Sequence, residues 1–95
     1  MLRKEINMEI LKVSSKTKVN SLAGAIAGTI REEGVAEISA IGAGAVNQAI
    51  KAIATAKGFL SPGGIDIVCI PSFGATGIGA DERTFITLTV KKETH

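Results

Sequence analysis

Two segments of the chain place apolar residues three and four positions apart, which is the spacing of one face of an α-helix. The first follows a polar loop, residues 14–18, and stops before Gly34, which we expect to cap the helix in the left-handed conformation. The second follows the turn at residues 42–44 and is predicted to end at Gly58. The expected core-facing positions are Val19, Leu22, Ala23, Ile26, Ala27 and Ile30 in the first helix and Val46, Ala49, Ile50, Ile53 and Ala54 in the second.

Three short segments outside these helices have the pattern of β-strands. Residues 9–13 form an apolar run that is typical of a strand buried on both faces, and residues 35–41 form the next strand. Residues 65–70 predict a further strand that ends at Pro71, because proline cannot donate to a strand ladder. A glycine-containing loop over residues 72–82 follows, and we expect it to be mobile.

The last strand, residues 83–90, alternates between two kinds of side chain. Ile86, Leu88 and Val90 fall on one face, and Phe85, Thr87 and Thr89 fall on the other. Such alternation is typical of a sheet with one covered and one exposed face. The order of elements therefore predicts an α/β two-layer sandwich, βαβαββ, in which two helices pack on one face of a four-stranded mixed sheet.

The length of 95 residues predicts a single domain. No apolar run reaches the roughly 18 residues of a membrane helix, and the first residues lack the apolar core of a secretory signal. We therefore expect a cytoplasmic protein with no membrane partner. Because the chain has 11 glycines and only three aromatic residues, its core is lean, and self-association is expected.

The reactive side chains argue against catalysis. Cys69 is the only cysteine and His95 the only histidine, so neither a disulfide framework nor a His/Cys metal site is expected. The serines at 14, 15 and 72 have no histidine apart from the chain end to activate them. The adjacent carboxylates at 32–33 and 81–82 point to different sides. We expect no enzyme activity, no metal and no cofactor.

Two glycine motifs resemble ligand-binding turns but lack the required context. Residues 42–44, Gly-Ala-Gly, open a helix after a strand as in dinucleotide-binding proteins, but the third glycine of that motif is missing. Residues 74–77 spell the GXXG of KH domains, where the loop joins two helices, whereas here it joins two strands. Small-ligand or nucleotide binding at the first turn is therefore the third-ranked hypothesis.

Basic residues are concentrated at the start of the chain. The net charge is only +2, but residues 1–20 carry five bases against two acids. Lys16 and Lys18 stand just before the first helix, where free N–H groups and the helix dipole favour anions. The pattern fits either a phosphate-binding corner or a solvated, positively charged loop.

Several ungapped blocks along the chain carry a family resemblance. They are EILKVS at 9–14, NSLAGA at 20–25, AIGAGA at 40–45, NQA at 47–49, KA at 51–52, CIP at 69–71 and ERT at 82–84. From residue 8 to about residue 91, the sequence resembles the stage V sporulation protein S family. This extent implies a domain at residues 8–92, with an N-terminal extension at 1–7 and a C-terminal tail at 93–95. The resemblance implies a small bacterial protein of spore maturation and coat assembly with an Alba-like βαβαββ fold.

The resemblance also implies a way of binding. Alba-like proteins dimerise and bind nucleic acid through lysines between the first strand and the first helix, helped by the hairpin of the last two strands. On this basis the nucleic-acid-binding residues are Lys12, Lys16, Lys18 and Arg83. One departure is that this chain has Gly42–Gly44 and Gln48 where Alba-like proteins commonly place bases entering the second helix, so part of the expected phosphate contact is absent.

We therefore predict a non-enzymatic, sporulation-associated regulatory protein that binds the backbone of DNA or RNA without reading its sequence, as a homodimer or tetramer. The alternative is a protein-interaction adaptor in spore maturation that binds no nucleic acid. Such an adaptor would contact its partners through small-residue surfaces or the exposed sheet.

Overall fold

The computed structural model describes residues 10–76 and 83–93, with residues 75, 76, 83 and 84 described by their backbone alone. The elements are β1 (Ile10–Val13), α1 (Val19–Glu33), β2 (Val35–Ala40), α2 (Ala43–Leu60), the 3₁₀ turn η1 (Ser61–Gly63), β3 (Ile67–Thr76) and β4 (Arg83–Lys92). This is the predicted βαβαββ order. The expected extension at residues 1–7 and most of the loop at 72–82 lie outside the described residues.

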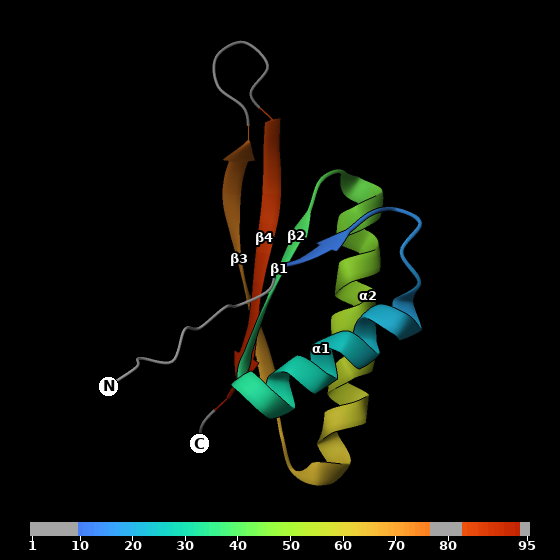
Figure 1. Ribbon diagram of the computed structural model, residues 1–95, viewed down its shortest axis with the longest axis vertical. Helices are drawn as coiled ribbons and strands as arrows, with labels where there is room; N and C mark the ends of the chain where they lie inside the picture. Colours follow the sequence, from blue (N-terminus) through green and yellow to red (C-terminus); the bar gives the residue numbers. More distant parts are fainter. Residues whose placement is uncertain (1–9, 77–82, 94–95) are drawn as a thin grey trace, which may run out of the picture.

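The four strands form one mixed sheet in the order β1-β2-β4-β3. β1 runs parallel to β2, whereas β4 pairs antiparallel with both β2 and β3. Both helices cover one face of this sheet (Figure 1). The predicted two-layer sandwich is therefore confirmed.

The core lies between the helices and the covered face of the sheet. The strand residues that face it stand in register, as in the row Leu11, Ile38, Leu88 across β1, β2 and β4. The fully buried large side chains are Ile26, Ile30, Ile38, Leu60 and Val90. On β4 the predicted alternation holds, since Leu88 and Val90 are buried and Ile86 packs against the core, whereas Phe85, Thr87 and Thr89 point to the other face.

The predictions for α1 are confirmed at both its face and its end. All of the expected core positions from Leu22 to Ile30 are buried, and Val19 packs against the core. Gly34 adopts φ of 84° and donates its N–H to the Ile30 carbonyl at 2.9 Å. A left-handed residue at this position is the usual way to end a helix, and glycine adopts it without steric cost.

The prediction that Gly58 ends α2 is wrong. The helix continues to Leu60, and the chain reverses only at Gly64, which has φ of 81°. An exposed glycine inside a helix costs only about 1 kcal/mol relative to alanine, which the burial of Leu60 outweighs.

The predicted face of α2 is also partly wrong. Ala49 and Ile53 are buried as expected, but Ala54 is exposed and Ile50 is 48% exposed. The buried stripe is made instead of small residues, with Ala45, Ala52 and Ala56 joining Ala49. An alanine face lets α1 and α2 approach closely, and that packing overrides the larger apolar side chains on the neighbouring face.

Two strand predictions need correction because both strands lie at edges of the sheet. β1 is not buried on both faces, since Ile10 is 51% exposed and Lys12 is exposed. β3 does not end at Pro71 but continues to Thr76, so residues 72–76 belong to a strand and not to a loop. An edge strand tolerates proline, because the side turned away from its neighbour needs no N–H donor.

In the described part of the chain, neither helix combines the length and the apolar character that crossing a membrane requires.

Candidate nucleic-acid interface

The segment between β1 and α1, residues 14–18, is a compact loop that we call the lysine loop. The Thr17 N–H donates to the Ser14 carbonyl at 3.1 Å, and the Ser14 N–H donates to the Thr17 hydroxyl at 2.9 Å. The Lys16 N–H donates to the Ser14 hydroxyl at 3.1 Å. These bonds fold the loop on itself and leave the side chains of Lys16 and Lys18 exposed.

The lysine loop rests on the first turns of α2. The Gln48 side-chain amide donates to the Thr17 carbonyl at 2.8 Å. One turn earlier, Gly44 lies so close to Ser15 that a Cβ at Gly44 would come within 2.8 Å of the Ser15 Cβ. The loop is therefore fixed to α2 as well as to the strand and helix that it joins.

The starts of α1 and α2 offer uncompensated positive potential. Neither helix has a side-chain hydrogen bond capping its first turn, and neither has an acidic residue there. Lys18 itself occupies the N-cap of α1, and Gly42, with φ of 96°, occupies that of α2. Free N–H groups and the helix dipole favour anions at both helix starts.

Charges in the described part of the chain are unevenly distributed. Four of the five described carboxylates lie at the end of the sheet opposite the lysine loop, where the α1 terminus, the start of β3 and the end of β4 meet; they are Glu32, Glu33, Asp66 and Glu93. There they mix with bases, and Lys57 pairs with Asp66 at 2.5 Å. The fifth, Glu37, lies within β2, in register with Thr89. In the described part of the chain no carboxylate forms an ion pair with Lys16 or Lys18.

The other two predicted residues lie apart from the lysine loop. Lys12 is exposed on β1, in register with Ser39, and its side chain points to the face of the sheet that the helices leave open. The backbone of Arg83 pairs with Thr76 at the far end of the β3–β4 hairpin. The structure thus places Lys16 and Lys18 together, Lys12 on the adjoining face, and the Arg83 backbone on the β3–β4 hairpin.

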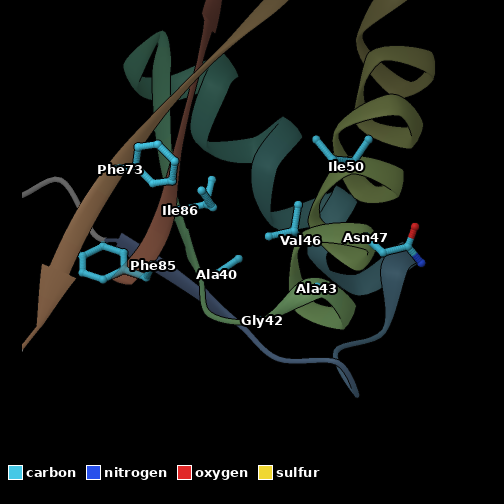
Figure 2. Close-up of a pocket in the computed structure, with 9 residues that line it drawn as sticks. All are labelled: Ala40, Gly42, Ala43, Val46, Asn47, Ile50, Phe73, Phe85 and Ile86. Atoms are coloured by element: carbon cyan, nitrogen blue, oxygen red, sulfur yellow. The ribbon is translucent and has the colours of Figure 1, made fainter. Parts of the chain in front are cut away.

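An open apolar hollow of about 630 Å³ lies between the hairpin and the first half of α2 (Figure 2). Phe73 and Ile86 form its hairpin wall, and Val46 and Ile50 form its helix wall. Phe73 is 80% exposed, the highest value among the exposed large apolar side chains of the described residues. The residues that line it, among those the structure describes, are Ala40, Gly42, Ala43, Val46, Asn47, Ile50, Phe73, Phe85 and Ile86.

The described residues offer little chemistry for a reaction. Cys69 is half-buried on β3, and burial raises the pKa of its thiol, which keeps it protonated and poorly nucleophilic at neutral pH. Within residues 10–76 and 83–93, no three His, Cys, Asp or Glu side chains are grouped so that they could hold a metal ion.

Sequence reasoning missed the contact of Gly44 and Gln48 with the lysine loop and the hollow beside Ile50. Gln48 and Thr17 are 31 positions apart, so no local pattern connects them. The sequence does contain a signal for the hollow, because Ala45, Ala49, Ala52 and Ala56 form a complete helical stripe on their own. That stripe leaves Val46 and Ile50 on a second apolar face of the same helix.

A family model described as Stage V sporulation protein S (SpoVS) matches residues 9–93 of this chain. The match includes both helices, all four strands, the lysine loop and the residues that line the hollow.

Proposed function

The chain belongs to the stage V sporulation protein S family, and from this premise we propose that it is a non-enzymatic, cytoplasmic regulatory protein of sporulation that binds the backbone of DNA or RNA. The observation that carries the proposal is the pair Lys16 and Lys18, exposed and without an ion-pair partner in the described part of the chain, on a loop between two uncapped helix starts. Ammonium groups with free N–H donors beside them suit phosphate oxygens.

Binding of this kind does not depend on the base sequence of the nucleic acid. Lysines on phosphates act as point charges, and the described residues offer Phe73 at the hollow but no aromatic side chain in the lysine loop on which a base could stack. With about two to four phosphate contacts per protomer, affinity at physiological salt is weak, and a second protomer doubles the number of contacts. The proposed function therefore includes self-association.

The apolar hollow supports a homodimer. Phe73 projects from the same surface that the hollow indents, so two copies related by a twofold axis can each place a phenyl ring in the other's hollow. Exposed apolar area of this kind is typical of interaction sites. The hollow adjoins the start of α2, on which the lysine loop rests, so pairing here would bring two lysine loops into one assembly.

The test is the salt dependence of binding to a short DNA duplex and to a single-stranded RNA of matching sequence. The variant Lys16→Ala/Lys18→Ala should bind more than about tenfold more weakly at 50 mM salt, because two phosphate contacts per protomer are lost. The slope of log K against log salt should become shallower by roughly 1.8 for each protomer in contact. Fluorescence anisotropy across about 50 to 200 mM salt measures both quantities.

The matched control is Lys91→Ala/Lys92→Ala. It removes the same charge from the opposite end of the sheet, where both side chains are exposed among carboxylates. This variant should keep the affinity to within about twofold and keep the salt slope. Equal effects of the two double variants, or binding by neither protein nor variants, would reject the lysine loop as the nucleic-acid interface.

The hollow also favours a second candidate, a protein-interaction adaptor that binds no nucleic acid. In that case Phe73→Ser would abolish retention of defined partner proteins from sporulating cells, and Lys16→Ala/Lys18→Ala would leave it unchanged. The first candidate predicts that nucleic acid is lost with Lys16→Ala/Lys18→Ala, and that Phe73→Ser weakens its retention only through loss of the second protomer's contacts.

A further inference from the structure

We propose that Gln48 and Gly44 are positioning residues that hold the lysine loop on α2, so that Lys16 and Lys18 face solvent as a fixed pair. This inference rests on the proposed function, because the benefit of a fixed pair appears only when the pair binds a polyanion. The family resemblance predicts basic residues near the positions of Gly44 and Gln48. We assign to these two residues a role in holding the loop.

Gln48 holds the loop by its backbone. Its amide donates to the Thr17 carbonyl at 2.8 Å in a partly buried setting, and Thr17 directly precedes Lys18 at the N-cap of α1. A partly buried hydrogen bond to the main chain restricts the peptide that carries the next side chain. Because the glutamine amide is neutral, it leaves the net charge of the loop unchanged.

Gly44 holds the loop by contact. A Cβ at this position would lie 2.8 Å from the Ser15 Cβ and 3.6 Å from the Ser15 Cα. These atoms belong to the backbone or are bonded to it, so the loop itself would have to move. Gly44 and Gln48 are four positions apart on α2 and lie on one face of that helix, with the loop above them.

Alternate residues of the lysine loop contact α2, and the residues between them are exposed to solvent. Ser15 and Thr17 contact α2, whereas Lys16 and Lys18 are exposed and have no ion-pair partner within the described residues. A loop fixed before binding loses less backbone entropy when it meets its ligand, so more of the electrostatic attraction appears as affinity. The predicted role of Gln48 and Gly44 is therefore to raise affinity without adding a phosphate contact.

The experiment compares Gln48→Ala and Gly44→Ala with the full-length parent. Affinity for the short DNA duplex at fixed low salt should fall about threefold to tenfold in each variant, the loss expected for one main-chain hydrogen bond or an equivalent packing contact. The salt slope should stay that of the parent, because the number of lysines is unchanged. Without DNA, amide hydrogen exchange of residues 14–18 should become faster in both variants.

Thr55→Ala is the matched control. Thr55 lies on α2 outside the lining of the hollow, and its hydroxyl donates within the helix, to the Lys51 carbonyl at 2.9 Å, so the variant removes a side-chain hydrogen bond that does not reach the lysine loop. This variant should match the parent in affinity, salt slope and loop exchange. Gln48→Ala only removes atoms, so it carries the test even where Gly44→Ala does not fold.

The outcomes separate this inference from the function on which it rests. If the parent binds DNA and Gln48→Ala binds equally well, or if its salt slope changes as in Lys16→Ala/Lys18→Ala, positioning by Gln48 is refuted. If the parent does not bind nucleic acid, the proposed function fails, and the positioning role for binding fails with it. In that case, unchanged amide hydrogen exchange of residues 14–18 in Gln48→Ala would show that Gln48 does not hold the lysine loop on α2.

Discussion

At the scale of single residues, glycine has different tasks at different positions of the same helix. Gly34 ends α1 with φ of 84°, a conformation in which any other L-residue is strained. Gly24 lies within α1 on its exposed face, and a Cβ there would meet no atom within 4 Å. The first glycine is therefore required by the backbone, and the second is not.

Alanine at the two positions should have opposite effects on stability. Gly34→Ala should lower the free energy of unfolding by about 1 to 2 kcal/mol because of left-handed strain. Gly24→Ala should raise it by about 0.5 to 1 kcal/mol through lower backbone entropy in the unfolded chain. Urea unfolding followed by circular dichroism, at one protein concentration, measures both changes. Destabilisation by Gly24→Ala would contradict the open surroundings of this position on α1.

The residues of the candidate interface divide into those that sequence predicts and those that it does not. Lys16 and Lys18 were placed correctly before a helix start, because polar loops and helix caps have local signals. Their support by Gln48 and Gly44 depends on contacts between segments about 30 positions apart. Such contacts follow from how α2 is turned about its axis, which apolar periodicity left ambiguous.

At the scale of elements, α2 joins three surfaces. Its alanine stripe packs in the core, where α1 lies against it. Gly44 and Gln48 support the lysine loop, and Val46 and Ile50 form one wall of the hollow. The prediction of a single core stripe through Ile50 was wrong because two apolar faces overlap on this helix, and the alanine face gives the closer helix packing.

The β3–β4 hairpin supplies the opposite wall and the projecting ring of Phe73. If two copies pair through the hollow as proposed, Phe73→Ser should shift the protein towards monomer and weaken self-association at least tenfold, because a large apolar side chain at the centre of an interface carries much of its energy. Sedimentation velocity over a concentration series measures this shift. Phe59→Ser, which alters an exposed phenylalanine at the far end of α2, is the control and should leave association unchanged.

A dimer that persists in Phe73→Ser, or an equal loss in Phe59→Ser, would contradict pairing through the hollow.

The hairpin also shows why strand ends are hard to predict. Proline at residue 71 has the same sequence signal whether a strand ends there or continues as the edge of a sheet. The edge position of β3 is a property of the whole topology.

At the scale of the whole molecule, a net charge of +2 hides an uneven distribution. In the described part of the chain, bases and carboxylates mix at one end of the sheet, whereas the end with the lysine loop carries exposed lysines and two uncapped helix starts. The predicted fold class was correct in element order and layers, because alternating strand and helix patterns limit the topology to few arrangements.

The most direct test of the nucleic-acid interface is a titration of the ¹⁵N-labelled protein with a short DNA duplex at low salt, followed by amide chemical shifts. We expect the largest changes in the lysine loop and the first turns of α1 and α2, and changes that disappear as salt is raised. Shifts concentrated instead around Gly34, Gly64 and Lys92, or no shift at any amide, would contradict the account.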